Sequence, residues 1–319
     1  MPTSVLDPPA TRRSVSPAQQ LRTTMAAVRV SFTWLGIRKT LSAEQKAQAA
    51  ESFGAAGEFL SAGKKLIDNR HAAFRAVTAI RGKVQTYWKS LTLPYPEPGI
   101  RLIKQDQIDA FDVTLRDLRG ELVEAVEELD AHYNDFKVAA RQRLGTLYNP
   151  SDYPAALEGL FLVDWDFPNV EPPGYLRELN PELYEQERAR VIARFEEAVQ
   201  LAESAFLDEF GKLVSHLCER IQGVDGEKKI FRDSAVTNLR EFFDRFKGLN
   251  VRSNEQLDAL VAQAQQVVRG IEPRDLRERP QIRQQVATDL SRVQSALDQL
   301  LVDRPRRRIL RGPVAAEGN

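Results

Sequence analysis

Residues 108–147 read IDAFDVTLRDLRGELVEAVEELDAHYNDFKVAARQRLGTL. A series with alternating spacings of three and four residues runs through this stretch at Phe111, Leu115, Leu118, Leu122, Ala125, Leu129, His132, Phe136 and Ala139. Such heptad spacing keeps one stripe of a helix against a partner helix. Arg143 interrupts the series, and Leu147 closes it. At about 1.5 Å per residue the helix would be roughly 60 Å long, so it requires a long partner.

A second stretch of similar length is the expected partner. Asn180 precedes Pro181, the arrangement of an N-cap residue before a proline at the first helical position. One stripe then contains Tyr184, Val191, Phe195, Ala198, Ala202, Ala205, Phe210, Leu213, Leu217 and Ile221. The two long helices, near 106–147 and 181–222, are therefore predicted to lie side by side and antiparallel.

Three short segments predict β-structure beside these helices. Residues 28–35 alternate apolar and polar side chains, residues 160–167 are rich in apolar residues, and residues 91–103 contain three prolines and Gly99. Alternation is typical of a half-buried strand, whereas the prolines favour a hairpin or a rigid extended loop. The sequence thus predicts a mainly α protein, an elongated antiparallel long-helix coiled-coil bundle with a small β-containing head.

Aromatic residues gather in this predicted head at Trp34, Trp165 and Phe167. They are expected either to pack the head or to form an exposed contact patch for a partner. The body of the protein is predicted to span residues 17–302. Within it, a capping box at Ser42 and Gln45 predicts a helix start, and further helices are expected at 71–88, 234–246, 253–268 and 281–301.

Both ends of the sequence are predicted to be flexible, an arm over residues 1–16 and a basic tail over 303–319. Residues 304–311 contain five arginines: Arg304, Arg306, Arg307, Arg308 and Arg311. These side chains are candidates for binding nucleic acid, an anionic membrane or an acidic protein groove. The other interpretation is a solubilising end that also interacts with the acidic long helix.

Charge is balanced overall but segregated along the chain. The 319 residues include 45 basic and 45 acidic side chains, which argues against a protein whose whole surface binds nucleic acid. Residues 106–136 nevertheless hold ten acids against Arg116 and Arg119. The single cysteine, Cys218, is expected to be a small core residue. Because no secretory signal or membrane span is recognisable, the expected location is cytoplasmic.

The sequence contains no recognisable motif for a cofactor, a metal ion or catalysis. Five residues separate Gly57 from Gly63, whereas four lie between the glycines of a Walker A loop, and Lys65 stands where that loop has Ser or Thr. His132 and His216 lack the Glu-x-x-His spacing of a di-iron site. They are expected to face each other across the two long helices. The sequence therefore predicts no cofactor, no metal site and no enzymatic activity.

Four segments resemble a bacterial and phage family catalogued as domain of unknown function 3150. They are Val30-Ser-Phe-Thr-Trp-Leu-Gly36, Leu93-Pro-Tyr-Pro-Glu-Pro-Gly-Ile100, Asn250-Val-Arg-Ser-Asn-Glu-Gln-Leu257 and Val302-Asp-Arg-Pro-Arg-Arg307. The resemblance extends over residues 28–311. It implies genomic proximity to MoxR-type AAA+ ATPases and von Willebrand A domain proteins, and it assigns no role to any residue.

The favoured function is a non-enzymatic interaction or scaffold protein of a cytoplasmic bacterial or phage complex, either as a homo-oligomer or with an AAA+ ATPase or von Willebrand A protein. Separated acidic and basic regions suit electrostatic selection of a partner. One alternative is a pore-forming or membrane-active helical protein, for which the apolar residues 161–163 are the relevant feature. Another is a nucleic-acid-associated phage or defence component that binds through the basic tail.

Overall fold

The computed structural model describes residues 15–222 and 233–302 and is mainly helical with a small antiparallel sheet. The chain divides into two compact units. The sheet unit comprises Thr24–Leu93 and Glu97–Val170, and the helical unit comprises the described parts of Met1–Thr23, Pro94–Pro96 and Glu171–Asn319.

The four-stranded sheet brings together all three segments predicted for the head. Its order is β4 (Thr92–Pro94), β5 (Ile100–Lys104), β1 (Met25–Trp34) and β6 (Phe161–Asp166). The central strand β1 runs antiparallel to both neighbours, with Met25 opposite Lys104 and Trp34 opposite Phe161. The prediction of a small β-containing part is therefore confirmed, and residues 91–103 supply two strands of it.

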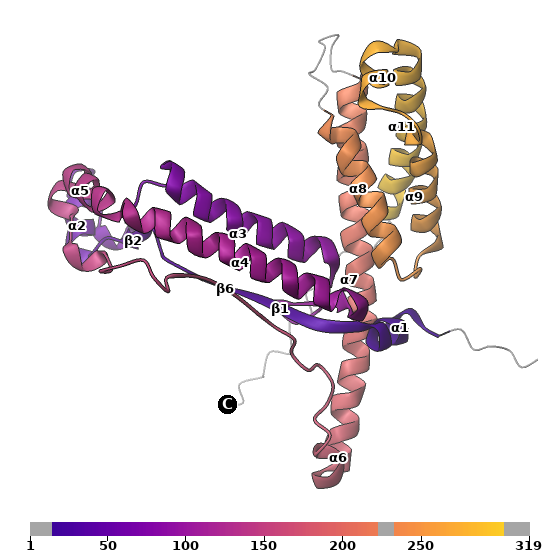
Figure 1. Cartoon of the computed structure of the whole chain (residues 1–319), viewed down its shortest axis with the longest axis horizontal. Helices are drawn as coiled ribbons and strands as arrows, with labels where there is room; N and C mark the ends of the chain where they lie inside the picture. The colour runs from indigo at the N-terminus through magenta and orange to yellow at the C-terminus, as the bar shows by residue number, and fades with distance from the viewer. Residues whose placement is uncertain (1–14, 223–232, 303–319) are drawn as a thin grey trace, which may run out of the picture. The chain divides into compact units, whose positions relative to one another are not determined.

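Two helices pack on one another and on the sheet: α3 (Ala72–Leu91) and α4 (Ile108–Ala131) (Figure 1). His71 caps α3, because its Nδ1 accepts the Ala73 N–H. The shared core contains Val28, Val30, Phe74, Val77, Ile80, Phe111, Leu115, Leu122, Phe161 and Val163. Each large apolar side chain buried in this way contributes about 2 kcal/mol.

The predicted continuous helix over 106–147 is interrupted. A 3-10 turn, η2 (Gln105–Gln107), precedes α4, which ends at Ala131, and α5 (Tyr133–Leu144) begins after His132. Beyond Leu122 the predicted Leu129 and Phe136 are buried, but Val126, Tyr133 and Ala140 are buried in place of the predicted Ala125, His132 and Ala139. Val126 and Tyr133 remove more apolar surface from water than Ala125 and His132 would, which explains why they are preferred at two of these positions.

A two-stranded ribbon, β2 (Arg38–Thr40) and β3 (Gly63–Lys65), was missed in the sequence. Between its strands lie α2 (Ala43–Glu51), with the predicted capping box, and the 3-10 turn η1 (Gly57–Phe59). A Cβ atom on Gly57 would lie 2.8 Å from the Ala47 Cα. The small residues of this region therefore allow close packing of η1 on α2. After α5, the turns η3 (Gly145–Leu147) and η4 (Pro150–Asp152) lead toward β6.

The helical unit is built on α7 (Pro181–Gln222), whose bounds agree with the predicted second long helix. Its other helices are α1 (Pro17–Thr24), α6 (Leu176–Leu179), α8 (Ser234–Leu249), α9 (Glu255–Val268), α10 (Pro273–Glu278) and α11 (Pro280–Val302). The helices α8 and α11 pack directly on α7, and α9 packs on α11 (Figure 1). A cluster of phenylalanines joins α7 to α8: Phe206, Phe210, Phe242, Phe243 and Phe246. Cys218 is buried, as predicted.

The expected coiled-coil pairing of the two long helices with each other is not confirmed. The main helical partner of α4 is α3, and those of α7 are α8 and α11. A heptad stripe requires burial but does not specify which apolar surface provides it, so each long helix packs mainly against shorter neighbours. Across residues 15–222 and 233–302, every helix is too short or too polar for a transmembrane segment.

Candidate functional site

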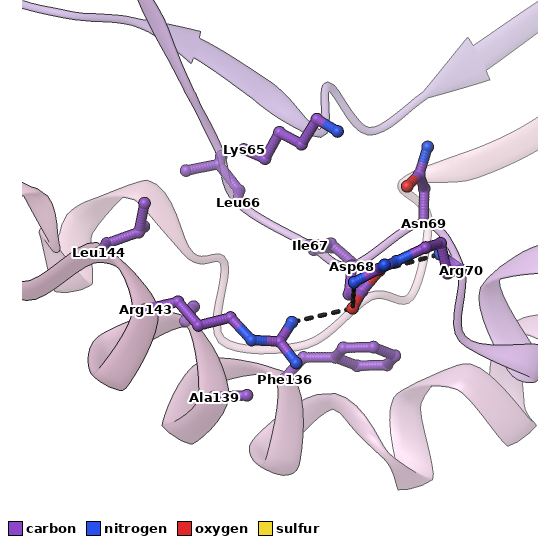
Figure 2. A pocket seen from close by; sticks show the side chains of 11 residues that line it. Lys65, Leu66, Ile67, Asp68, Asn69, Arg70, Phe136, Ala139, Arg143 and Leu144 are labelled. Carbon is purple, nitrogen blue, oxygen red and sulfur yellow. Dashed lines mark hydrogen bonds and ion pairs between the residues drawn. The ribbon is translucent and has the colours of Figure 1, made fainter.

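The candidate site is a pocket of about 360 Å³ in the sheet unit, between the segment that follows β3 and the helix α5 (Figure 2). Its apolar lining includes Leu66, Ile67, Phe136 and Leu144. Charged and polar side chains complete the lining: Lys65, Asp68, Asn69, Arg70 and Arg143. A pocket of this composition suits a ligand that has both an apolar part and a charged group.

Asp68 organises the charged side of this pocket. Its Oδ1 accepts the backbone N–H of Arg70 at 3.0 Å, and its Oδ2 accepts Nη1 of Arg143 at 2.8 Å (Figure 2). The Arg70 guanidinium also donates to it, with Nε 3.2 Å from Oδ1. These hydrogen bonds from Arg70, and then that from Arg143, hold the pKa of Asp68 well below its ordinary value. Two guanidinium groups share one carboxylate, so the cluster retains a positive charge.

A buried ion cluster fixes the ribbon that leads into the pocket. Lys64 is 8% exposed, and its Nζ lies 2.6 Å from Oδ2 of Asp152 and donates to the Leu147 carbonyl at 2.6 Å. The other carboxylate oxygen of Asp152 lies 2.6 Å from Nζ of Lys39. Lys39, followed by Lys64, lowers the pKa of Asp152. Lys64 therefore holds β3 to the turn at 145–152, which supports the rejection of a phosphate loop at this lysine.

A second depression, of about 480 Å³, shares Asp68, Arg70, Phe136 and Arg143 with the first and adds two histidines. The rings of His71 and His132 lie 5.1 Å apart, and Nε2 of His132 lies 3.2 Å from Oε1 of Glu128. Within the sheet unit the aromatic neighbour of His132 is thus His71. His216 belongs to the helical unit, and its predicted pairing with His132 stays a prediction. Within the part of the chain that the structure describes, no three His, Cys, Asp or Glu residues are placed to hold a metal ion.

The predicted partner-binding aromatics lie elsewhere in the sheet unit. Trp34 is half-buried, and its ring meets that of Phe161 edge-on with the ring centres 5.0 Å apart. The Arg81 guanidinium carbon lies 4.9 Å from the centre of the Trp34 ring. Trp165 is also half-buried, and its Nε1 donates to Oδ1 of Asp112 at 2.9 Å. Both tryptophans therefore help to pack the sheet against its helices. Phe167 follows β6 and is exposed. The roles of all three in partner binding stay predictions.

Two further predictions concern other parts of the chain. The apolar run 161–163, on which the membrane-active alternative depends, lies in β6, where Phe161 and Val163 are buried. The candidate arginines of the basic tail, Arg304, Arg306, Arg307, Arg308 and Arg311, lie outside the described residues.

Sequence reasoning missed the pocket itself. Its cations come from residues 65–70 and from Arg143, which are far apart in the chain. One signal was present, because Arg143 occupies a position where the heptad series calls for an apolar residue. A charged residue at such a position is expensive to bury and points to a salt bridge or a ligand. Here the salt bridge is with Asp68.

Comparison with known protein families, with curated proteins and with solved structures finds no match for this chain. The resemblance to the domain of unknown function therefore rests on the four quoted segments and stays a prediction. Asp68 is the one carboxylate among the residues lining the first pocket, and two arginines already neutralise it, which makes it a poor general base.

Proposed function

We propose that this protein is a non-enzymatic interaction protein, an adaptor or scaffold of a cytoplasmic complex, and that its partner docks at the pocket between β3 and α5. The observation that carries this proposal is the Asp68 cluster, in which Arg70 and Arg143 surround one carboxylate beside an apolar lining. Such a surface offers positive charge and an apolar pocket to a protein segment. Its carboxylate, Asp68, already accepts hydrogen bonds from Arg70 and Arg143.

The partner class comes from the family resemblance, which favours an AAA+ ATPase or a von Willebrand A protein. Such a partner would be recognised by direct contact, and charges at the rim of an interface mainly set its specificity and its association rate. Arg143 is well placed for this role, because 61% of its side chain remains exposed although it bonds to Asp68. Arg141, two residues earlier on α5, is also exposed but does not line the pocket.

These two arginines provide a matched test. The full-length tagged protein is purified from its natural host as wild type, Arg143→Ala and Arg141→Ala, and the recovered proteins are identified by mass spectrometry. We expect the wild type and Arg141→Ala to recover the same partner and Arg143→Ala to recover about tenfold less, which corresponds to a loss of about 1.4 kcal/mol of binding. Circular dichroism checks that both variants are folded.

Recovery of the tagged chain alone would contradict the proposed function. Equal recovery of one partner by all three proteins would retain an interaction protein but remove the pocket as its docking site.

A further inference from the structure

The β2–β3 ribbon places four cations in two cross-strand pairs. Arg38 lies opposite Lys65, and Lys39 lies opposite Lys64. Residues directly opposite each other in an antiparallel pair share a face, and successive residues alternate between faces. One pair therefore lies on each face of the ribbon. Like charges at directly opposite positions destabilise a ribbon, so each pair requires a counter-charge.

The pair Lys39 and Lys64, here called the inner pair, has its counter-charge within the protein. Lys39 and Lys64 each lie 2.6 Å from one oxygen of the Asp152 carboxylate, whose side chain is 1% exposed. A single buried acid thus offsets the repulsion between two lysines.

The outer pair, Arg38 and Lys65, has no such acid among the described residues. Arg38 and Lys65 are both exposed, and neither forms an ion pair with an acid of residues 15–222 or 233–302. In the four-stranded sheet of the same unit, by contrast, a cation lies opposite an acid. Arg29 is opposite Asp166 and donates to both of its carboxylate oxygens, at 2.9 and 2.6 Å. An anion from outside the chain would relieve the repulsion between Arg38 and Lys65.

Lys65 connects this outer pair to the pocket. It lines the pocket together with Asn69, Arg70 and Arg143, next to the apolar Leu66 and Phe136. We infer that the Arg38–Lys65 pair and the pocket together bind an acidic peptide segment of a partner protein, in which an aspartate or glutamate is adjacent to a large apolar side chain. The carboxylate contacts Arg38 and Lys65, and the apolar side chain enters the pocket. This inference rests on the proposed function.

The charges of the same unit favour a short acidic peptide over a nucleic acid. Asp135 lines the adjoining depression, and α4 presents several exposed acids to solvent: Asp117, Glu121, Glu124, Glu127 and Glu128. A phosphate backbone carries a charge at every nucleotide, so extending it along this unit would bring it close to these carboxylates. One or two carboxylates held at Lys65 avoid that repulsion.

The inference is tested on the full-length protein with defined probes. Fluorescence anisotropy measures binding of a short labelled peptide that alternates Glu and Phe, of the same peptide with Gln for Glu, and of a single-stranded DNA of similar length. The variants are Arg38→Glu and Lys65→Glu, with Lys89→Glu, an exposed lysine on α3, as the charge-matched control. The thermal unfolding midpoint of each variant is recorded by circular dichroism.

We expect the Glu peptide to bind more tightly than the Gln peptide and the DNA. Each ribbon substitution should weaken its binding by about tenfold, equivalent to about 1.4 kcal/mol, and Lys89→Glu should leave binding unchanged. Because either ribbon substitution converts a like-charge pair into an opposite-charge pair, we also expect Arg38→Glu and Lys65→Glu to raise the unfolding midpoint by about 1–2 °C. A loss of binding together with a gain of stability cannot result from misfolding.

Three results would overturn the inference: equal binding of the Glu and Gln peptides, tighter binding of the DNA, or binding of the Glu peptide that is insensitive to both ribbon substitutions. Failure of this inference can be told apart from failure of the proposed function. A partner recovered equally by the wild type and Lys65→Glu would leave an interaction protein without this binding mode. Binding of the Glu peptide by a chain that recovers no cellular partner would support the inferred chemistry alone.

Discussion

Replacing Lys64 with methionine is expected to lower the free energy of unfolding of the sheet unit by about 3 kcal/mol. Methionine keeps much of the length of the lysine side chain but removes the charge that lies 2.6 Å from Asp152. Since the Asp152 side chain is 1% exposed, water cannot solvate the carboxylate that loses this partner. Urea unfolding of the full chain, followed by circular dichroism, measures the change.

Lys39→Met is the matched control, because Lys39 contacts the same carboxylate but its side chain is 56% exposed. Its ion pair is screened by water, so the expected loss is below about 1 kcal/mol. In Lys64→Met combined with Asp152→Asn, the buried negative charge is removed too, and part of the lost stability should return. Losses of similar size for Lys39→Met and Lys64→Met would show that burial does not distinguish the two lysines.

The same experiment has a defined pH dependence. Lys39 and Lys64 lower the pKa of Asp152 in the folded protein, whereas in the unfolded chain it is about 3.9. A carboxylate with a lowered folded-state pKa stabilises the protein above its unfolded-state pKa, and this stabilisation is lost as the pH falls through the folded-state pKa. The difference between the wild type and Lys64→Met should therefore be complete at pH 7 and decrease below about pH 4.

The second large effect is expected from Phe210→Ala in the helical unit. Phe210 is fully buried, and its ring stacks on that of Phe242 with centres 5.2 Å apart and planes at 2°. It also contacts Phe243 edge-on. Removing the ring leaves a cavity at the contact between α7 and α8, for which the cost is about 4 kcal/mol. The thermal unfolding midpoint measured by circular dichroism should fall accordingly.

Tyr175→Ala is the matched control in the same unit, because Tyr175 is 62% exposed. The loss of an exposed ring should change stability by less than about 0.5 kcal/mol. A loss below about 1 kcal/mol for Phe210→Ala would mean that the phenylalanine cluster is not a tightly packed contact between α7 and α8.

Local signals in the sequence predicted local structure well. The Asn180-Pro181 cap fixed the start of α7, the capping box at Ser42 marked α2, and alternating residues marked β1. These features depend on residues a few positions apart, so the sequence contains them directly. The 3-10 turns and the three-residue strands β2 and β3 were missed, because such short segments have no periodicity to detect.

Tertiary features were predicted less well. The heptad series of α4 correctly indicated an apolar stripe but not α3 as its main helical partner, and it could not show that Val126 and Tyr133 would replace Ala125 and His132 in the core. The choice depends on how well side chains from distant segments fill space. The candidate pocket was missed for the same reason, since Arg143 meets Asp68 only in the folded chain.

Hydrogen–deuterium exchange of the full-length protein, with and without the Glu and Phe peptide, tests the docking site most directly. We predict slower exchange on peptide binding in the ribbon and its following segment, residues 63–70, and in α5, with no change along α7. Protection confined to other segments, or no protection at a peptide concentration that saturates the anisotropy signal, would contradict a docking site between β3 and α5.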